Sequence, residues 1–193
     1  GDMLLSSLVN LGADKNKIIE GVMKSQKFLQ DSIIKKMDFQ KIQKRGIEST
    51  ELILEIDENI SERKGVEIKK AILDSVNELS LTTKAKIFAE SCIDTLISSE
   101  SKIHGISENS VHFHEALDDL KLFEEKIVCL PVSVGGGTVS FSHGTMSNPA
   151  SAILQIFKNS NLNIQGNNSK EELTTPTGAC ILVNLTDNPV QHY

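Results

Sequence analysis

Two histidines and a glutamate lie side by side in the stretch His112-Phe113-His114-Glu115. If this stretch is a strand, His112 and His114 point to the same face, because side chains alternate along a strand. Two imidazoles at this spacing can grip one borderline metal ion such as zinc or nickel. Glu115 is suited to orient an imidazole from a neighbouring element. The spacing therefore indicates a metal site, and the alternative is a solvated strand end.

Such a pair of imidazoles provides two ligands, so a third must come from elsewhere in the chain. His143 is one candidate, and Asp118 and Asp119 are the others. A metal-dependent hydrolase, in which a bound ion generates hydroxide, needs a further carboxylate or histidine that converges on the pair. A non-catalytic alternative makes the same stretch a subunit contact, with Phe113 buried against another chain. No residue is assigned a catalytic role.

A second candidate site is the motif ELTTPTGA near the end of the chain. Thr175 is suited to cap a helix, and Pro176 fits the first helical position. The hydroxyls of Thr174, Thr175 and Thr177, followed by Gly178, then surround free backbone N–H groups at a helix start. Such an arrangement is a suitable seat for a phosphate or a carboxylate. The alternative is a well-capped helix that binds nothing.

Two further motifs are interpreted as structural. Gly135 to Gly137 follow one strand-like segment and precede another, so they match neither a dinucleotide fingerprint nor a Walker A loop. We expect a bulge or tight turn there that needs a positive φ. His104-Gly105 is interpreted as the end of a helix, where a protonated histidine complements the helix dipole.

The elements that must position these residues follow from hydrophobic periodicity and from helix start and stop signals. Helices are predicted over 3–11, which Gly12 ends, over 15–29, which Asp14 caps, and over 66–79, with Ile68, Ile72, Leu73 and Val76 on one face. Further helices are predicted over 83–103, 149–157 and 177–185. Strands are predicted over 38–44, over 50–56, where TELILEI alternates, over 126–134 and over the short segment TVSF, and residues 159–170 are predicted to form an exposed loop rich in asparagine and serine. In the fourth helix the predicted core positions are Ile87, Phe88, Cys92, Leu96 and Ile97. Helices and strands alternate loosely, which favours an α+β or α/β fold with helices layered on a mixed sheet. We expect two lobes, 1–109 mainly helical with a strand pair and 110–193 α/β.

Composition excludes several classes of function. The chain has 193 residues and a net charge of −6, so it lacks the basic surplus that a nucleic-acid partner requires. No run of 18 apolar residues exists, and we therefore expect no membrane span. Its three cysteines form no CxxC pair. We interpret them as buried free thiols in a reducing compartment and expect a cytoplasmic protein.

Several motifs occur together in an order that resembles one known family. They are GDM at the start, SKIHG, VHFHEA, a strand leading into a glycine turn and SHG, and finally ELTTPTGA. The chain resembles the nickel-insertion proteins that mature the nickel-pincer nucleotide cofactor of lactate racemase. VHFHE and ELTTPTGA are distinctive when they occur together. The resemblance covers nearly the whole chain and is firmest over residues 84 to 187.

The resemblance implies a nickel chelatase. Such an enzyme places Ni²⁺, its substrate metal, into pyridinium-3,5-bisthiocarboxylic acid mononucleotide, and the full-length protein uses CTP with a divalent metal. His112 and His114, with His143 as third ligand, would hold nickel, and the start of the last helix would receive the mononucleotide phosphate. Expected partners are the mononucleotide, Ni²⁺, lactate racemase or a related apo-enzyme, and further copies of the chain. Two alternatives remain, a nickel-storage module without turnover and a metal-dependent hydrolase.

The chain departs from the family pattern in three places. The family has a short strand and a glycine-rich turn before GDM, whereas this chain starts at Gly1. The family also has about one strand and one helix after HFHE, so we hypothesise that a segment is absent between Ala116 and Leu117. Asp118 and Asp119 would then belong to the end of a later helix and not to the metal site. Finally, family members carry a C-terminal domain associated with nucleotide binding, so residues 1–193 correspond to the N-terminal region without that domain.

Overall fold

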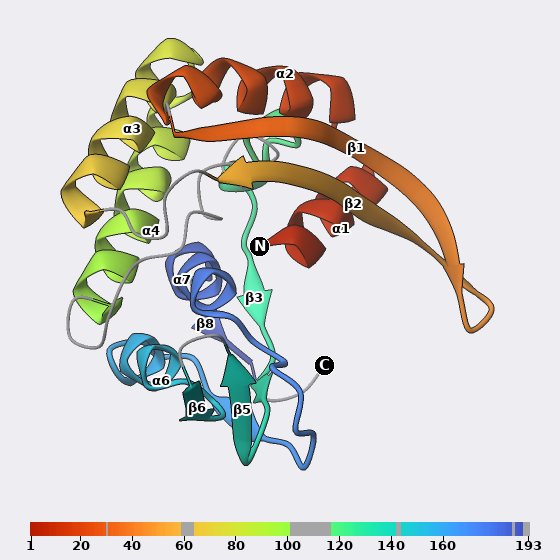
Figure 1. Cartoon of the computed structure of the whole chain (residues 1–193), viewed down its shortest axis with the longest axis vertical. Helices are drawn as coiled ribbons and strands as arrows, with labels where there is room; N and C mark the ends of the chain where they lie inside the picture. Colours follow the sequence, from red (N-terminus) through yellow and green to blue (C-terminus); the bar gives the residue numbers. More distant parts are fainter. Residues whose placement is uncertain (30, 59–63, 101–116, 142–143, 187, 191–193) are drawn as a thin grey trace. The chain divides into compact units, whose positions relative to one another are not determined.

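The computed structural model describes residues 1–29, 31–58, 64–100, 117–141, 144–186 and 188–190 (Figure 1). The chain forms two compact units, which are considered one at a time below. Unit 1 comprises Gly1–Ser91 and Ile106–Glu125, and unit 2 comprises Cys92–Gly105 and Lys126–Tyr193. Helices combine with small antiparallel and parallel strand pairs, which confirms the predicted α+β class. None of the described helices is long and apolar enough to cross a bilayer.

Unit 1 begins with two helices whose ends follow local sequence signals. Helix α1 (Asp2–Leu11) ends at Gly12, which adopts the left-handed conformation at φ 117° that glycine tolerates best. Helix α2 (Lys15–Ser25) starts at the predicted cap, where the Asp14 carboxylate accepts bonds from the backbone N–H groups of Asn16 and Lys17. The prediction that this helix continues to Leu29 is wrong, because a 3₁₀ turn, η1 (Gln26–Phe28), follows it.

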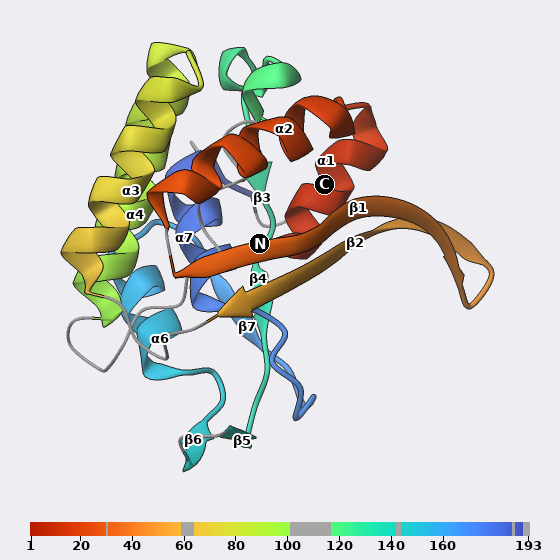
Figure 2. The same ribbon diagram turned by 45° about the horizontal axis from the view of Figure 1, so that its top comes forward.

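The predicted strand pair of unit 1 is confirmed as a long antiparallel ribbon. Strand β1 (Ser32–Lys44) begins earlier than predicted and pairs with β2 (Ile47–Glu58). The connecting residues Arg45 and Gly46 both have positive φ, as a two-residue hairpin turn requires. Opposite charges face each other across the pair, as in the 2.7 Å contact between Lys35 and Asp57. Helix α1 packs against β2 and α2 against β1, and the ribbon can be followed in Figure 2.

Unit 1 also contains two longer helices and a short 3₁₀ turn, η2 (Leu122–Glu124). Helix α3 (Gly65–Glu78) buries Ile68, Ile72 and Val76 of the predicted stripe, while Leu73 is half-buried. Helix α4 (Thr83–Glu100) contains the boundary between the two units. Its predicted core positions Phe88, Cys92 and Leu96 are buried. The core assignment of Ile87 is wrong, because its side chain is 58% exposed and lies outside the arc formed by the buried positions.

Unit 2 pairs its short strands two by two within the described residues. The predicted strand 126–134 is divided into β3 (Val128–Cys129) and β4 (Val132–Val134), because Pro131 between them has no N–H to donate to a ladder. Strand β3 pairs in parallel with β8 (Asn188–Pro189), and β4 pairs in parallel with β7 (Ile164–Gly166). Strands β5 (Thr138–Phe141) and β6 (Gly144–Ser147) form an antiparallel pair.

The core of unit 2 is formed largely by two helices. Helix α6 (Ser151–Lys158) packs against α7 (Pro176–Leu185). Ile153 and Ile156 from α6, and Ala179 and Ile181 from α7, are almost completely buried. The predicted last helix is confirmed, and its apolar middle section holds the polar start of α7 in place.

Candidate functional site

The start of α7 carries the hydroxyl cluster that the sequence singled out. Thr175 is the N-cap, and its Oγ1 accepts a 3.1 Å bond from the backbone N–H of Gly178, while Pro176 occupies the first turn. The Thr174 hydroxyl donates a 2.8 Å bond to the carbonyl of Ser133 in β4. Thr177 and Gly178 are buried, and Thr174 and Thr175 are half-buried. The structure therefore brings all four predicted residues together at one helix start.

Most of the polar groups at this helix start already have partners within the chain. The N–H of Gly178 bonds to the Thr175 hydroxyl, and the N–H of Ala179 bonds to the Thr175 carbonyl at 2.9 Å. Pro176 has no N–H, so the backbone donor of Thr177 is the one that remains in the first turn. The start of α7 is therefore well capped, as the alternative interpretation expects. It offers an anion fewer free backbone donors than the four of an uncapped helix start.

The glycine turn after β4 serves the packing of unit 2. Gly137 has φ 82°, which confirms the expected turn with a positive φ. At Gly135, an added Cβ would lie 2.2 Å from the Asn148 side-chain nitrogen and 2.2 Å from the carbonyl oxygen of Glu171. The Asn148 amide, which is buried there, donates a 2.9 Å bond to that same carbonyl. The space beside the backbone of Gly135 is therefore occupied by the Asn148 side chain.

Asp118 and Asp119 have structural partners in unit 1. Asp118 accepts bonds from the backbone N–H and the hydroxyl of Thr82, immediately before α4. Asp119 accepts a 2.8 Å bond from the backbone N–H of Asp14 and a 2.6 Å bond from the ammonium group of Lys17, at the start of α2. These bonds hold the pKa of Asp119 below its usual value, chiefly through the Asp14 N–H and then through Lys17. Both carboxylates therefore anchor helix starts, where the helix dipole favours negative charge.

The predicted metal ligands lie outside the described residues. His112, His114 and Glu115 fall in the undescribed stretch 101–116, and His143 falls in the undescribed pair between β5 and β6. The hypothesis of an absent segment between Ala116 and Leu117 falls at the edge of the same stretch. Among the described residues, no three His, Cys, Asp or Glu side chains form a group that could hold a metal ion. The metal-site assignment therefore stays a prediction.

The cysteines of unit 2 are free thiols, as expected, but the expectation that all three are buried is wrong, because Cys129 is only half-buried. Cys92 and Cys180 are buried, and the Cys92 thiol donates a weak bond to the carbonyl of Cys180. Burial raises the pKa of Cys92 far above its ordinary value, and the neighbouring Cys180 adds to this rise. Burial also raises the pKa of Cys129. Neither Cys92 nor Cys129 is therefore a reactive thiolate at neutral pH.

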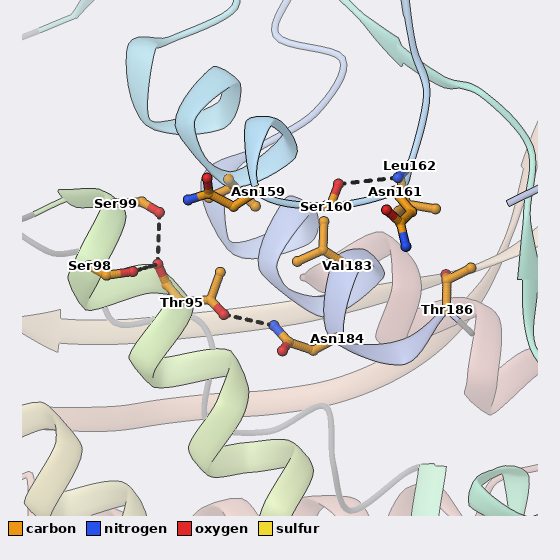
Figure 3. Close-up of a pocket in the computed structure, with 11 residues that line it drawn as sticks. Thr95, Ser98, Ser99, Asn159, Ser160, Asn161, Leu162, Val183, Asn184 and Thr186 are labelled. Carbon is orange, nitrogen blue, oxygen red and sulfur yellow. Dashed lines mark hydrogen bonds between the residues drawn. The ribbon is translucent and has the colours of Figure 1, made fainter. Parts of the chain in front are cut away.

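Unit 2 also contains a polar pocket of about 330 Å³ that the sequence did not reveal (Figure 3). Three segments line it: the second half of α4, residues 156–162 at and after the end of α6, and residues 183–186 at the end of α7. The run Asn159-Ser160-Asn161 opens the predicted exposed loop 159–170 and supplies three of the residues that line the pocket. All three of these side chains can both donate and accept hydrogen bonds, and this is the feature of the sequence that points to such a site.

Comparison with known proteins gives a consistent result. Residues 1–192 match the family described as nickel insertion protein. The chain is 32% identical to a putative nickel insertion protein of Methanococcoides burtonii, across 94% of this chain and 46% of that protein. It is 33% identical to the pyridinium-3,5-bisthiocarboxylic acid mononucleotide nickel insertion protein of Staphylococcus saprophyticus, across 94% of this chain and 47% of that protein. No solved structure gave a significant match.

A third relative bears on the organisation of the chain. The putative nickel insertion protein of Methanosphaera stadtmanae is 34% identical across 100% of this chain and 51% of its own length. That alignment extends over 218 positions, more than the 193 residues of this chain. The chain spans about half the length of the curated relatives that it matches.

Proposed function

The chain belongs to the nickel insertion protein family, and we propose that it takes part in inserting Ni²⁺ into pyridinium-3,5-bisthiocarboxylic acid mononucleotide. The observation that carries this proposal is the family match over residues 1–192, together with relatives from two staphylococci that are named for this reaction. In this reaction, nickel and the mononucleotide are both substrates. The chain corresponds to the half of those relatives that it matches.

The proposed nickel ligands are His112 and His114, with His143 as the third ligand and Glu115 as a partner that orients an imidazole. Neutral imidazole is a borderline ligand that binds nickel well. The two thiocarboxylate sulfurs of the mononucleotide are softer donors, and they compete effectively for the same ion. Nickel would therefore pass from nitrogen to sulfur by stepwise ligand exchange, without any change of oxidation state.

The proposed seat for the mononucleotide phosphate is the start of α7. Thr174, Thr175, Thr177 and Gly178 lie together there, and the positive end of the helix dipole favours an anion. Thr177→Val keeps the volume of this buried side chain and removes its hydroxyl. We expect weaker mononucleotide binding and unchanged nickel binding, measured by calorimetry. Thr83→Val, at the exposed first residue of α4, is the matched control, and equal mononucleotide affinity in all three proteins would contradict the phosphate seat.

We further propose the context of the reaction. In the complete protein, insertion would depend on CTP with a divalent metal, and the metallated nucleotide would serve lactate racemase or a related apo-enzyme. We also propose that the protein is a cytoplasmic homo-oligomer. The family resemblance supports the reaction context, and the unpaired cysteines support a reducing compartment.

The decisive experiment uses the complete protein under anaerobic conditions. It is incubated with Ni²⁺, CTP and the dithio mononucleotide, and the nucleotide is then analysed by mass spectrometry. We expect the nickel adduct to form, and to form far more slowly when CTP is omitted. Stoichiometric nickel binding without any adduct would instead identify a storage module and contradict the proposal.

A further inference from the structure

The polar pocket of unit 2 has the composition of a ligand site for an uncharged molecule. Eight of the eleven residues that line it are serine, threonine or asparagine, and the other three are Ile156, Leu162 and Val183. None of these eleven lining residues carries a charge or an aromatic ring. Figure 3 shows that the polar side chains come from three separate segments of the chain. A ligand would thus be surrounded by neutral hydrogen-bonding groups on more than one side.

Several of the polar groups keep capacity for a ligand. The hydroxyls of Ser98 and Ser99 donate to the carbonyl of Thr95, and the hydroxyl of Ser160 donates to the carbonyl of Phe157. A hydroxyl that donates its hydrogen still has lone pairs that can accept. The Ser160 hydroxyl already accepts a 3.2 Å bond from the backbone N–H of Leu162 and keeps one lone pair. Ser99 and Ser160 therefore offer acceptors to the hydroxyl groups of a bound molecule.

Asparagines supply the matching donors. The amide nitrogen of Asn184 is committed to Thr95 and Cys180, which fixes this side chain and leaves its carbonyl oxygen as an acceptor. No hydrogen bond of the Asn159 or Asn161 side chain to another described residue is present, and both residues are exposed. Each of these amides offers two donors and an acceptor side by side.

The chemistry of the lining selects among ligand classes. A phosphate or carboxylate would lack a cation here, which disfavours the mononucleotide and CTP themselves. A nucleobase would lack an aromatic ring to stack on. A sugar ring fits better, because its adjacent hydroxyls each donate and accept, as asparagine amides do. Its C–H face can rest on Ile156, Leu162 and Val183.

We propose that this pocket binds the uncharged ring of a pentose or hexose, either as a free sugar or as the sugar of a nucleoside. The pocket is separate from the proposed phosphate seat, because the two lie at opposite ends of α7. A helix of ten residues is about 15 Å long. The proposal therefore does not depend on nickel insertion, and it adds a second small-molecule site to unit 2.

The test is nitrogen-15 NMR of the whole chain titrated with D-ribose, cytidine and CMP, each to about 20 mM, because a single sugar ring is expected to bind with a Kd of about 1 mM. Ribose and cytidine should shift the side-chain amide signals of Asn159, Asn161 and Asn184. CMP should bind no more tightly than cytidine. Shifts with ribose identify a free-sugar site, and shifts with cytidine alone identify a nucleoside site.

Asn161→Ala should weaken ribose or cytidine binding about fivefold, the loss expected for one or two neutral hydrogen bonds. The matched control is Asn163→Ala, an exposed asparagine two residues further on that does not line the pocket. If none of the three probes shifts the asparagine signals, the pocket holds water only and the proposal is overturned. Equal weakening by both variants would also overturn it, because the effect would then not come from the pocket.

Discussion

The two units stabilise their helix starts in different ways. In unit 1, ionised side chains from distant parts of the sequence do so: Asp119 lies 105 positions from Asp14, whose N–H it binds. In unit 2, a neutral group does so: Thr175 caps α7 from within the same segment. Another neutral group, the amide of Asn148, fills the space beside Gly135 in the turn after β4. The contrast shows that acidic or hydroxyl-rich motifs resembling ligand sites can serve the fold. It also predicts that the two units respond differently to mutation and to acid.

The largest effect is expected for Gly135→Ala in unit 2. The new methyl group would collide with the Asn148 amide and with a backbone carbonyl, which cannot move like the end of a flexible side chain. We expect a loss of about 3 kcal/mol in the free energy of unfolding, measured in urea. Gly166→Ala is the control, because a Cβ there meets nothing within 4 Å. Similar losses in both variants would contradict the close packing at Gly135.

A smaller loss is expected for Asp119→Ala in unit 1. The change removes a carboxylate whose side chain is only 16% exposed, and it leaves the Asp14 N–H without its partner. We expect a loss of about 2 kcal/mol, typical of hydrogen bonds to a charged group. Glu20→Ala, which removes an exposed pair with Lys24, should change stability by less than about 0.5 kcal/mol. If Asp119→Ala lowers the free energy of unfolding no more than this control does, Asp119 does not anchor the start of α2.

Next in size is Thr175→Ala at the start of α7. Removing a threonine N-cap leaves the Gly178 N–H without its acceptor and costs about 1 kcal/mol. Thr175→Ser retains the hydroxyl and should restore nearly all of the lost stability. The measurement is again urea unfolding. If serine fails to restore stability, the cap is not what Thr175 contributes.

The smallest effect is a difference between the units in acid. The pKa of Asp119 is lowered in the folded chain, so its contribution is present above the unfolded value of about 3.9 and is lost as the pH falls through the lower folded value. In unit 2, partial burial raises the pKa of Glu172, so the contribution of this group to stability increases as the pH falls. Hydrogen exchange, corrected for intrinsic rates, should show that between about pH 5 and pH 3 protection falls in α2 but not in α7. Equal losses of protection in α2 and α7 would contradict this predicted difference between the two units.

Local signals in the sequence predicted the features that depend on neighbouring residues. Gly12, Asp14 and Thr175 mark helix ends through their own backbone or side-chain geometry, and the alternation in TELILEI marks a strand. These features follow from short-range physics, so they can be read without knowing the fold.

Features that depend on tertiary placement could not be predicted in this way. The partners of Asp118 and Asp119 come from segments far away in the chain, and the exposure of Ile87 depends on which arc of α4 is covered. The pocket requires three segments that meet only after folding. The acidic pair was considered as a source of metal ligands because sequence proximity to the histidines was the only guide.

The most direct test of the account is a calorimetric titration of the chain with Ni²⁺. The account assigns nickel binding to His112 and His114, and it assigns Asp118 to the fold, where it binds Thr82. We predict that His112→Ala combined with His114→Ala abolishes nickel binding, and that Asp118→Asn leaves the nickel affinity unchanged. Unchanged affinity in the double histidine variant, or lost affinity in a folded Asp118→Asn variant, would contradict the account.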